Sequence, residues 1–174
     1  MYELIPQKTN KIAARLVALS FFGAAAVLLC TVLAPAVPFR WVFQLIAILL
    51  LTAGVFLTTR YLTKLFFYRI TEDGDLTVTE AAANGKRQVT VCRVAVAGVR
   101  ELALPQSDAE VKALKKKLRR EKIKLFDYTV DCRPAQSIFV TVWEGGSLLC
   151  IRLSYDRTLS EILTPKENAS EADL

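Results

Sequence analysis

Two long apolar stretches without a charged residue lie in the first third of the chain, at residues 16–33 and 41–59. Each is close to the ~20 residues that a helix needs to cross a hydrocarbon layer of about 30 Å. We therefore predict membrane-spanning helices at about residues 13–35 and 41–60. Pro35 and Pro38 interrupt the helical pattern between them, which predicts a tight hairpin.

The charges that flank the two stretches are unequally distributed. Three basic residues precede the first stretch and three follow the second, whereas the connection holds only Arg40. The basic flanks are Lys8, Lys11, Arg15, Arg60, Lys64 and Arg69. Because positively charged flanks stay in the cytoplasm, we predict a multi-pass protein of the cell inner (plasma) membrane with both termini cytoplasmic.

Two features of the first stretch allow other interpretations. Ala34-Pro35-Ala36 resembles a signal-peptide cleavage site, but the apolar run is longer than the ~7–15 residues of a signal peptide, and a second span follows. Ser20, Gly23 and Ala24 form a face of small residues. This face can pack within the hairpin, against a second copy, or against another membrane protein.

After Lys64 the apolar residues follow a period of two, which predicts β-strands with one buried face. We expect strands at residues 66–71, 76–79, 88–92 and 94–104. Turn residues at 72–75 and the dipeptide Asn84-Gly85 predict two hairpins. Gly98, inside the fourth expected strand, predicts a bulge or a close approach of another backbone.

The second half of this region is predicted to start with a helix and continue with strands. Ser107 and Glu110 can cap a helix from Asp108 to about residue 122. Strands are expected at residues 126–132, 137–143 and 148–154, the last two as a hairpin. Asp156 can cap a short helix that ends at Leu163. The expected division is a membrane domain at residues 1–64, a cytosolic β domain at 65–165 and a disordered acidic tail at 166–174.

The order of these elements resembles the bacterial pleckstrin-homology-like (PH-like) family of membrane proteins with two N-terminal spans. The resemblance lies in the segment Phe66-Phe67-Tyr68-Arg69-Ile70-Thr71, in residues 94–102, and in Leu153-Ser154-Tyr155-Asp156 leading into residues 159–163. It implies a transmembrane hairpin followed by a mainly-β domain of two packed antiparallel sheets. The sheets would have four and three strands, with an inserted basic helix and a short C-terminal helix that closes one end.

The family also implies a membrane-associated binding or assembly module rather than an enzyme. Phosphoinositide-binding relatives have a basic loop between their first two strands. Here that loop is Glu72-Asp73-Gly74-Asp75, whose negative charge would repel phosphate. Inositol-lipid binding is therefore not expected at this loop.

The composition argues further against catalysis. The 174 residues include no histidine, which excludes Ser-His-Asp, Cys-His and His-ligated metal chemistry. The four cysteines form no CxxC pair, so we expect buried thiols and no metal. Asp127 and Asp131 would share one face of a strand, for which an exposed sheet face is a simpler explanation than an acid–base pair. We predict no enzyme activity and no cofactor.

The net charge of +6 arises from one segment, residues 112–124, in which Glu121 is the only acidic residue. Val111, Leu114, Leu118 and Leu125 form a narrow apolar stripe, which predicts that this helix docks on the sheet with its charges outward. The candidate contact residues for an anionic lipid or another partner are Lys112, Lys115, Lys116, Lys117, Arg119, Arg120, Lys122 and Lys124.

Three interpretations of the basic helix follow. It can be a solvated face that promotes solubility, or it can contact the anionic inner leaflet, which attracts basic segments by about 1 kcal/mol per Lys or Arg. An acidic protein or RNA is a third partner, but nucleic acid is disfavoured because no aromatic residues are interleaved.

We therefore predict a non-catalytic integral membrane protein that presents a cytosolic PH-like module to a protein partner or to anionic lipid headgroups. The alternative is a structural or assembly subunit of a larger membrane complex, such as a transporter or a secretion system.

Overall fold

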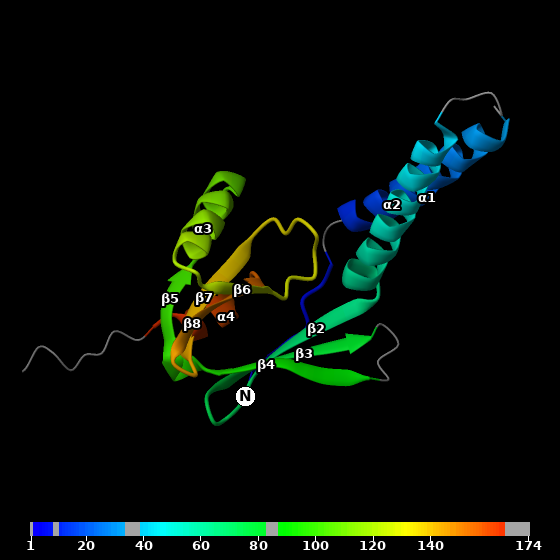
Figure 1. Ribbon diagram of the computed structural model, residues 1–174. Coiled ribbons are helices and arrows are strands. Elements are labelled where there is room, and N and C mark those ends of the chain that lie inside the picture. The colour runs from blue at the N-terminus through cyan, green and yellow to red at the C-terminus, as the bar shows by residue number, and fades with distance from the viewer. Residues whose placement is uncertain (1, 9–10, 34–38, 83–86, 166–174) are drawn as a thin grey trace, which may run out of the picture.

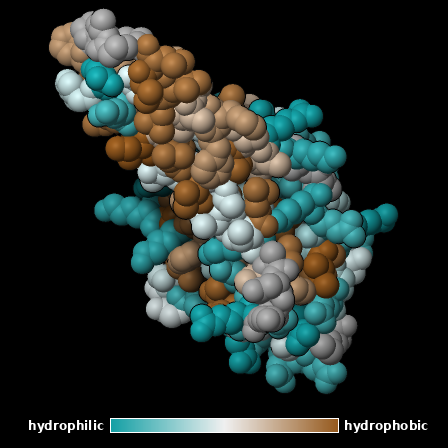
Figure 2. Space-filling view, turned by 90° about the vertical axis from the view of Figure 1, so that its right-hand side faces the viewer, coloured by the Kyte–Doolittle hydropathy of each residue, from teal (hydrophilic) through white to brown (hydrophobic). Residues whose placement is uncertain are grey.

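Two apolar helices rise side by side from a mainly-β region in the computed structural model, which describes residues 2–8, 11–33, 39–82 and 87–165 (Figure 1). They are α1 (Ile12–Leu33) and α2 (Arg40–Leu57), which the short π-helix η1 (Thr58–Leu62) continues. Both are long and apolar enough to cross a membrane, and only 11% of each apolar window is buried. Apolar side chains cover the pair, whereas hydrophilic ones dominate the β region (Figure 2). The two predicted helices are confirmed; the expected hairpin connection lies outside the described residues.

Small residues allow α1 and α2 to approach each other closely. Ala24 and Ala47 are fully buried. A Cβ atom built on Gly54 would lie 3.2 Å from the ring of Phe21 and 3.3 Å from the Cβ of Ser20. The small-residue face of α1 therefore packs within the hairpin.

The first sheet contains a strand from before the helices. Its order is β1 (Tyr2–Leu4), β2 (Lys64–Ile70), β3 (Asp75–Ala82) and β4 (Gln88–Ala95), with all neighbours antiparallel. Tyr2 lies opposite Ile70. Both ends of the helix pair therefore connect to one sheet, so β1 and the rest of the β region lie at the same end of the pair. The antiparallel pairing of β3 with β4 fits the expected hairpin, although residues 83–86 lie outside the described part.

The predicted fourth strand at residues 94–104 is wrong. The chain leaves the first sheet after Ala95, makes the 3₁₀ turn η2 (Val96–Gly98), and enters the second sheet as β5 (Val99–Ala103). A Cβ on Gly98 would lie 3.2 Å from the carbonyl oxygen of Trp143. The predicted close backbone approach is thus confirmed, and it occurs where the chain crosses between sheets.

The second sheet has four strands rather than the predicted three. Its order is β5, β7 (Ser137–Glu144), β8 (Ser147–Ser154) and β6 (Lys124–Asp127), and β6 runs parallel to β8. The predicted hairpin of β7 and β8 is confirmed, with positive φ angles at both Gly145 and Gly146 in its turn. The expected four-and-three antiparallel arrangement is therefore corrected to two four-stranded sheets, one with a parallel edge strand.

The predicted strand at residues 126–132 ends at Asp127. Beyond it the chain forms a loop in which Thr129, Val130 and Asp131 are buried. The backbone N–H and the hydroxyl of Thr129 both donate hydrogen bonds to the Asp127 carboxylate, at 3.1 and 2.7 Å. Such local bonds compete with the pairing of a strand, and they explain why an alternating pattern folds as a loop.

The two sheets pack face to face around the main core. The helix α4 (Arg157–Leu163) contributes Leu159 and Leu163, both fully buried, and Asp156 caps it as predicted. A smaller cluster lies on the other face of the second sheet, beneath α3 (Asp108–Arg120). The buried members of the main core include Phe66, Tyr68, Leu76, Val78, Ile138, Val140, Val142, Ile151 and Leu153.

Candidate functional site

Both ends of the basic helix α3 have capping interactions. The Ser107 hydroxyl accepts a hydrogen bond from the Glu110 N–H at 3.2 Å, and the Glu110 carboxylate accepts one from the Gln106 N–H at 2.9 Å. The bond from the Gln106 N–H, and a second one of 3.0 Å that the Ser107 hydroxyl donates to the same carboxylate, lower the pKa of Glu110. At the other end the Ile123 N–H donates to the Leu118 carbonyl, with Lys122 in the left-handed region at φ 56°. The predicted start at Asp108 is confirmed, and the helix ends two residues earlier than expected.

The apolar stripe of α3 docks on the second sheet as predicted. Leu118 is 4% exposed and packs in one cluster with Phe139 of β7 and Cys150 of β8. The basic side chains are left on the outside. All eight candidate contact residues of the helix and its flank are exposed, namely Lys112, Lys115, Lys116, Lys117, Arg119, Arg120, Lys122 and Lys124.

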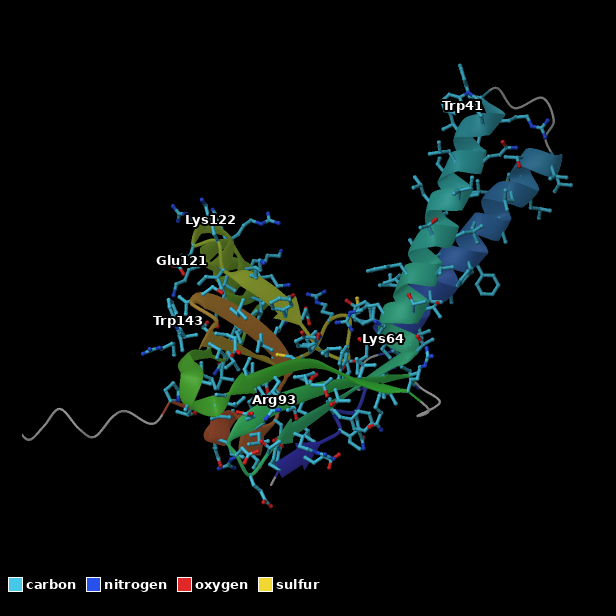
Figure 3. All side chains as sticks on the ribbon, turned by 60° about the horizontal axis from the view of Figure 1, so that its bottom comes forward. Trp41, Lys64, Arg93, Glu121, Lys122 and Trp143 are labelled. Atoms are coloured by element: carbon cyan, nitrogen blue, oxygen red, sulfur yellow. The ribbon has the colours of Figure 1, made fainter. Side chains whose placement is uncertain are left out.

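The helix α3 rises from the β region on the side from which α1 and α2 rise (Figure 1). A second view agrees, because Lys122 near the end of α3 and Trp41 at the far end of the helix pair both project to that side (Figure 3). Arg93 lies on the opposite part of the β region. The exposed basic helix α3 thus lies on the side of the β region from which the apolar helix pair rises.

Two adjoining hollows follow the α3 helix. The base cavity, of about 590 Å³, lies between the first turns of α3, residues 132–137 and Arg152. The apolar groove, of about 500 Å³, has a floor of Leu118, Ile123 and Leu125. Lys112 and Lys115 line both hollows, so the two lie next to each other along α3.

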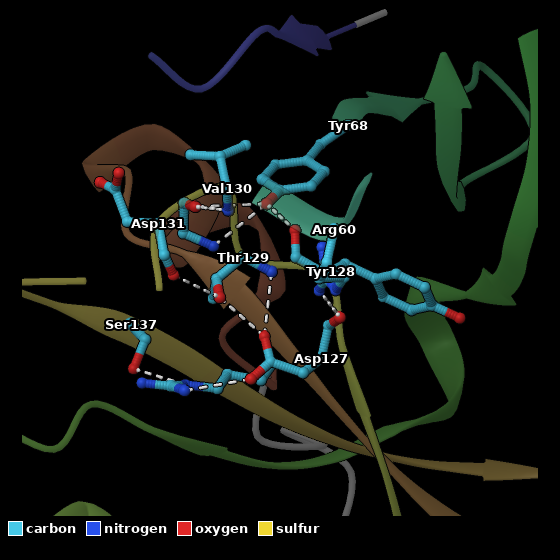
Figure 4. Close-up of polar contacts among 10 residues, drawn as sticks. Arg60, Tyr68, Asp127, Tyr128, Thr129, Val130, Asp131 and Ser137 are labelled. Carbon is cyan, nitrogen blue, oxygen red and sulfur yellow. Dashed lines mark hydrogen bonds and ion pairs between the residues drawn. The ribbon is translucent and has the colours of Figure 1, made fainter. Parts of the chain in front are cut away.

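Arg152 is a buried cation in the wall of the base cavity. The residue is 7% exposed, and its guanidinium lies 5.2 Å from the centre of the Phe139 ring. Its Nε donates to the Ser137 hydroxyl at 3.2 Å, and its Nη1 lies 3.1 Å from the Asp127 carboxylate (Figure 4). These contacts fix the cation and compensate its burial.

Asp127 connects this cavity to the base of the helix pair. Its carbonyl oxygen accepts a hydrogen bond of 2.5 Å from Nη2 of Arg60 in η1 (Figure 4). The Arg60 guanidinium also lies 5.1 Å from the ring centres of Tyr61 and Phe66. Its Nη1 is buried and has no hydrogen-bond partner among the described residues. Arg60, Asp127 and Arg152 therefore form a continuous polar connection from the helix pair to the base cavity.

Tyr68 fixes the loop that follows Asp127. Its hydroxyl donates to the Tyr128 carbonyl at 2.8 Å and accepts from the Ser154 N–H at 3.2 Å (Figure 4). Burial raises the pKa of Tyr68, which keeps the hydroxyl protonated as a donor. The loop is thus held by both sheets as well as by the helix pair.

The structure places the acidic residues and thiols considered from sequence differently from the expectation. The expected exposed pair is wrong, because Asp131 is 6% exposed and lies in the loop rather than on a strand face. Of the cysteines, only Cys150 is buried, and burial raises its pKa to about 11. No group of three or more His, Cys, Asp or Glu residues that could hold a metal occurs in the described part of the chain.

Sequence reasoning did not identify the connection through Arg60, Asp127 and Arg152. One signal was available, since Arg152 is a charge within the otherwise apolar run of β8. For Arg60 the sequence pattern indicates only a basic flank of the second span. Comparisons of the chain with protein-family models, with curated proteins and with solved structures gave no match.

Proposed function

We propose that this chain is a non-catalytic integral membrane protein whose α3 helix contacts anionic lipid headgroups of the membrane that α1 and α2 cross. In this proposal both termini and the PH-like β region lie in the cytoplasm, at the inner face of the plasma membrane. The observation that carries it is the position of α3, whose exposed basic residues project to the same side as the apolar helix pair (Figure 3).

The electrostatic argument depends on this proximity. An anionic leaflet attracts a basic residue by about 1 kcal/mol near its surface, and the attraction fades within a Debye length of about 8 Å. A helix tethered beside the bilayer meets the headgroups at high effective concentration. Because Leu118, in the apolar stripe of α3, packs on Phe139 and Cys150, the helix does not turn this stripe toward the bilayer for insertion. The proposed contact is therefore electrostatic and sensitive to salt.

The orientation is supported by the connection of both ends of the helix pair to one sheet. The pairing of β1 with β2 requires the N-terminal segment and the β region to share a compartment. The basic flanks of the two spans favour the cytoplasm. A structural-subunit role has less support, because the small-residue face of α1 is used within the hairpin.

The lipid contact is testable on the full chain in nanodiscs by footprinting lysines with an amine-reactive reagent and mass spectrometry. We expect Lys116, Lys117 and Lys122 to be protected in nanodiscs with anionic lipid, but not in those of phosphatidylcholine alone. Salt at about 0.5 M should restore labelling. Equal labelling in the two kinds of nanodisc would contradict the proposal.

A pair of charge reversals provides the matched control for this measurement. Arg119→Glu with Arg120→Glu should reduce the protection of the neighbouring lysines. Arg93→Glu with Arg100→Glu makes the same change of charge on β4 and β5 and should leave the protection unchanged. Orientation is tested separately by an alkaline phosphatase fusion after residue 174, since an active fusion would place that end outside the cytoplasm.

A further inference from the structure

We infer that the base cavity and the apolar groove together bind one anionic lipid with a terminal phosphate, its headgroup in the cavity and an acyl chain in the groove. This inference rests on the proposed membrane attachment. It adds a defined binding site to what would otherwise be a general attraction between α3 and the leaflet.

The charges of the base cavity match a phosphate monoester. Four cations line it, and two of them are neutralised by carboxylates, since Arg152 pairs with Asp127 and Arg133 pairs with Asp108. The other two are Lys112 and Lys115, which form no ion pair with an acidic residue of the described part of the chain. Their two positive charges equal the charge of about −1.5 to −2 that a phosphate monoester carries at pH 7.

The cavity also offers neutral donors to phosphate oxygens. The amide side chains of Gln106 and Gln136 belong to its lining, beside the first turn of α3. In the wall formed by residues 132–137, Arg133 pairs with Asp108 and Ser137 accepts a hydrogen bond from Arg152, so both ends of this wall are held before a ligand arrives.

The groove distinguishes a lipid from a soluble phosphate. Its apolar lining consists of Leu118, Ile123 and Leu125, and its rim consists of four cations. Leu118 is buried, whereas Ile123 and Leu125 are half-buried and supply the apolar surface that is left open. Inorganic phosphate or a soluble phosphate ester would leave this apolar surface without a partner, whereas an acyl chain covers it. The rim residues are Lys112, Lys115, Lys116 and Arg119.

The direction of the groove agrees with entry from the membrane. The polar cavity lies at the first turns of α3, and the apolar groove lies nearer its other end. That end is the one that projects to the side of the helix pair (Figure 3). A lipid would therefore place its headgroup in the cavity while its chain points back toward the bilayer.

The test uses the full chain in phosphatidylcholine nanodiscs that contain a phosphatidic acid probe with a diazirine in one acyl chain. After irradiation, mass spectrometry should find adducts within residues 118–125 as well as on α1 and α2. Unlabelled phosphatidic acid should compete for the adducts at residues 118–125, whereas glycerol 3-phosphate and inorganic phosphate should not. Adducts on α1 and α2 alone would overturn the inference, and full competition by the soluble phosphates would overturn the lipid as ligand.

Two variants probe the cavity without changing α3. Gln136→Glu places a carboxylate in its lining and should reduce the adducts at residues 118–125 about tenfold or more. Ala135→Trp fills the cavity without adding charge and should have a similar effect. Gln88→Glu makes the identical change on exposed β4 and should leave the adducts unchanged. Adducts that resist both cavity variants would contradict the headgroup position.

The lysine footprint separates this inference from the proposed function. Consider a result in which anionic lipid protects Lys116 and Lys117 in the Gln136→Glu variant, while residues 118–125 form no adducts even in the unmodified chain. This result would contradict the lipid site and leave the leaflet contact in place. If neither protection nor adducts occur, the proposed function itself fails.

Discussion

The two sheets of the β region differ in how they are covered. The second sheet is enclosed on both faces, by the first sheet and by α3, and six consecutive residues of β7 from Ser137 to Val142 are buried. The first sheet is covered on one face only. Its strand β4 leaves Val89 60% exposed and Val91 37% exposed. The hairpin of β7 and β8 is therefore the centre of the domain, although it lies late in the sequence.

This difference can be recognised in the amino-acid pattern. A strand that is buried on both faces has a nearly continuous apolar run, whereas a strand with one open face alternates. The run Ser-Ile-Phe-Val-Thr-Val of β7 fits the first description. The segment Leu76-Thr77-Val78-Thr79 of β3 fits the second, because Leu76 and Val78 are buried and the threonines between them are not. The covering helix α3 is what converts the second sheet into an interior layer.

The largest decrease in the free energy of unfolding is expected for Phe139→Ala. This substitution removes the centre of the cluster between α3 and the second sheet. Loss of a buried Phe side chain costs about 3–5 kcal/mol, because a cavity remains. Denaturant titration of the full chain in detergent, followed by Trp143 fluorescence in a Trp41→Phe background, measures this. A cost below about 1 kcal/mol would show that α3 does not cover the sheet in solution.

The comparison of the two sheets is tested directly by making one substitution in each. Val142→Ala in β7 should lower the free energy of unfolding by about 2 kcal/mol, since Val142 is fully buried. Val89→Ala in β4 removes the same atoms from an exposed site and should cost less than about 0.5 kcal/mol. Equal costs in the same titration would mean that the open face of the first sheet is covered.

Removing the N-terminal cap of α3, the helix that covers the second sheet, should lower the free energy of unfolding by a smaller amount. Ser107→Ala removes the cap of α3 and should cost about 1 kcal/mol, visible as faster hydrogen exchange in its first turn. The Glu110 carboxylate has a lowered pKa, so its contribution is present above the unfolded pKa of 4.5 and is lost as the pH falls through the lowered value. A first turn that exchanges equally fast at pH 7 and at pH 3, after correction for the intrinsic rates, would contradict this.

Substitutions in β1, the edge strand of the first sheet, should change the free energy of unfolding least. The Tyr2 hydroxyl donates a 2.5 Å hydrogen bond to Asp156, so Tyr2→Phe should cost about 1 kcal/mol or less and speed exchange in β1. Burial and the Asp156 carboxylate raise the pKa of Tyr2. The contribution of this bond is therefore complete below pH 10 and is lost as the pH rises further.

A neighbouring ion pair provides the control for this bond. Glu3→Gln breaks only the exposed pair with Arg69 and should cost under about 0.5 kcal/mol. If Glu3→Gln lowered the free energy of unfolding more than Tyr2→Phe does, the Glu3–Arg69 ion pair rather than the Tyr2 hydrogen bond would hold β1 in place.

Elements with strong local signals were predicted from the sequence. The apolar runs identified α1 and α2, Ser107 and Asp156 identified the starts of α3 and α4, and the two glycines identified the turn of β7 and β8. In each case a few neighbouring residues determine the structure. The exposed basic surface of α3 was predicted for the same reason.

Features that depend on distant residues were not predicted. The strand β1 has only three residues and obtains its structure from β2, about 60 positions later. The switch between sheets at Gly98 depends on its contact with Trp143. The connection of Arg60 to Asp127 joins residues 67 positions apart, which no local pattern reveals.

The pairing of β1 with β2 has a consequence for biogenesis. The strand β1 is synthesised before the two helices, whereas its partner β2 is complete only at Ile70. At 5–20 residues per second the strand waits for roughly 3–13 s. In the proposed topology the two apolar helices insert during this time, and a helix pair that inserts in the wrong number or direction leaves β1 on the other side of the bilayer. Under this proposal, the first sheet closes only after correct insertion.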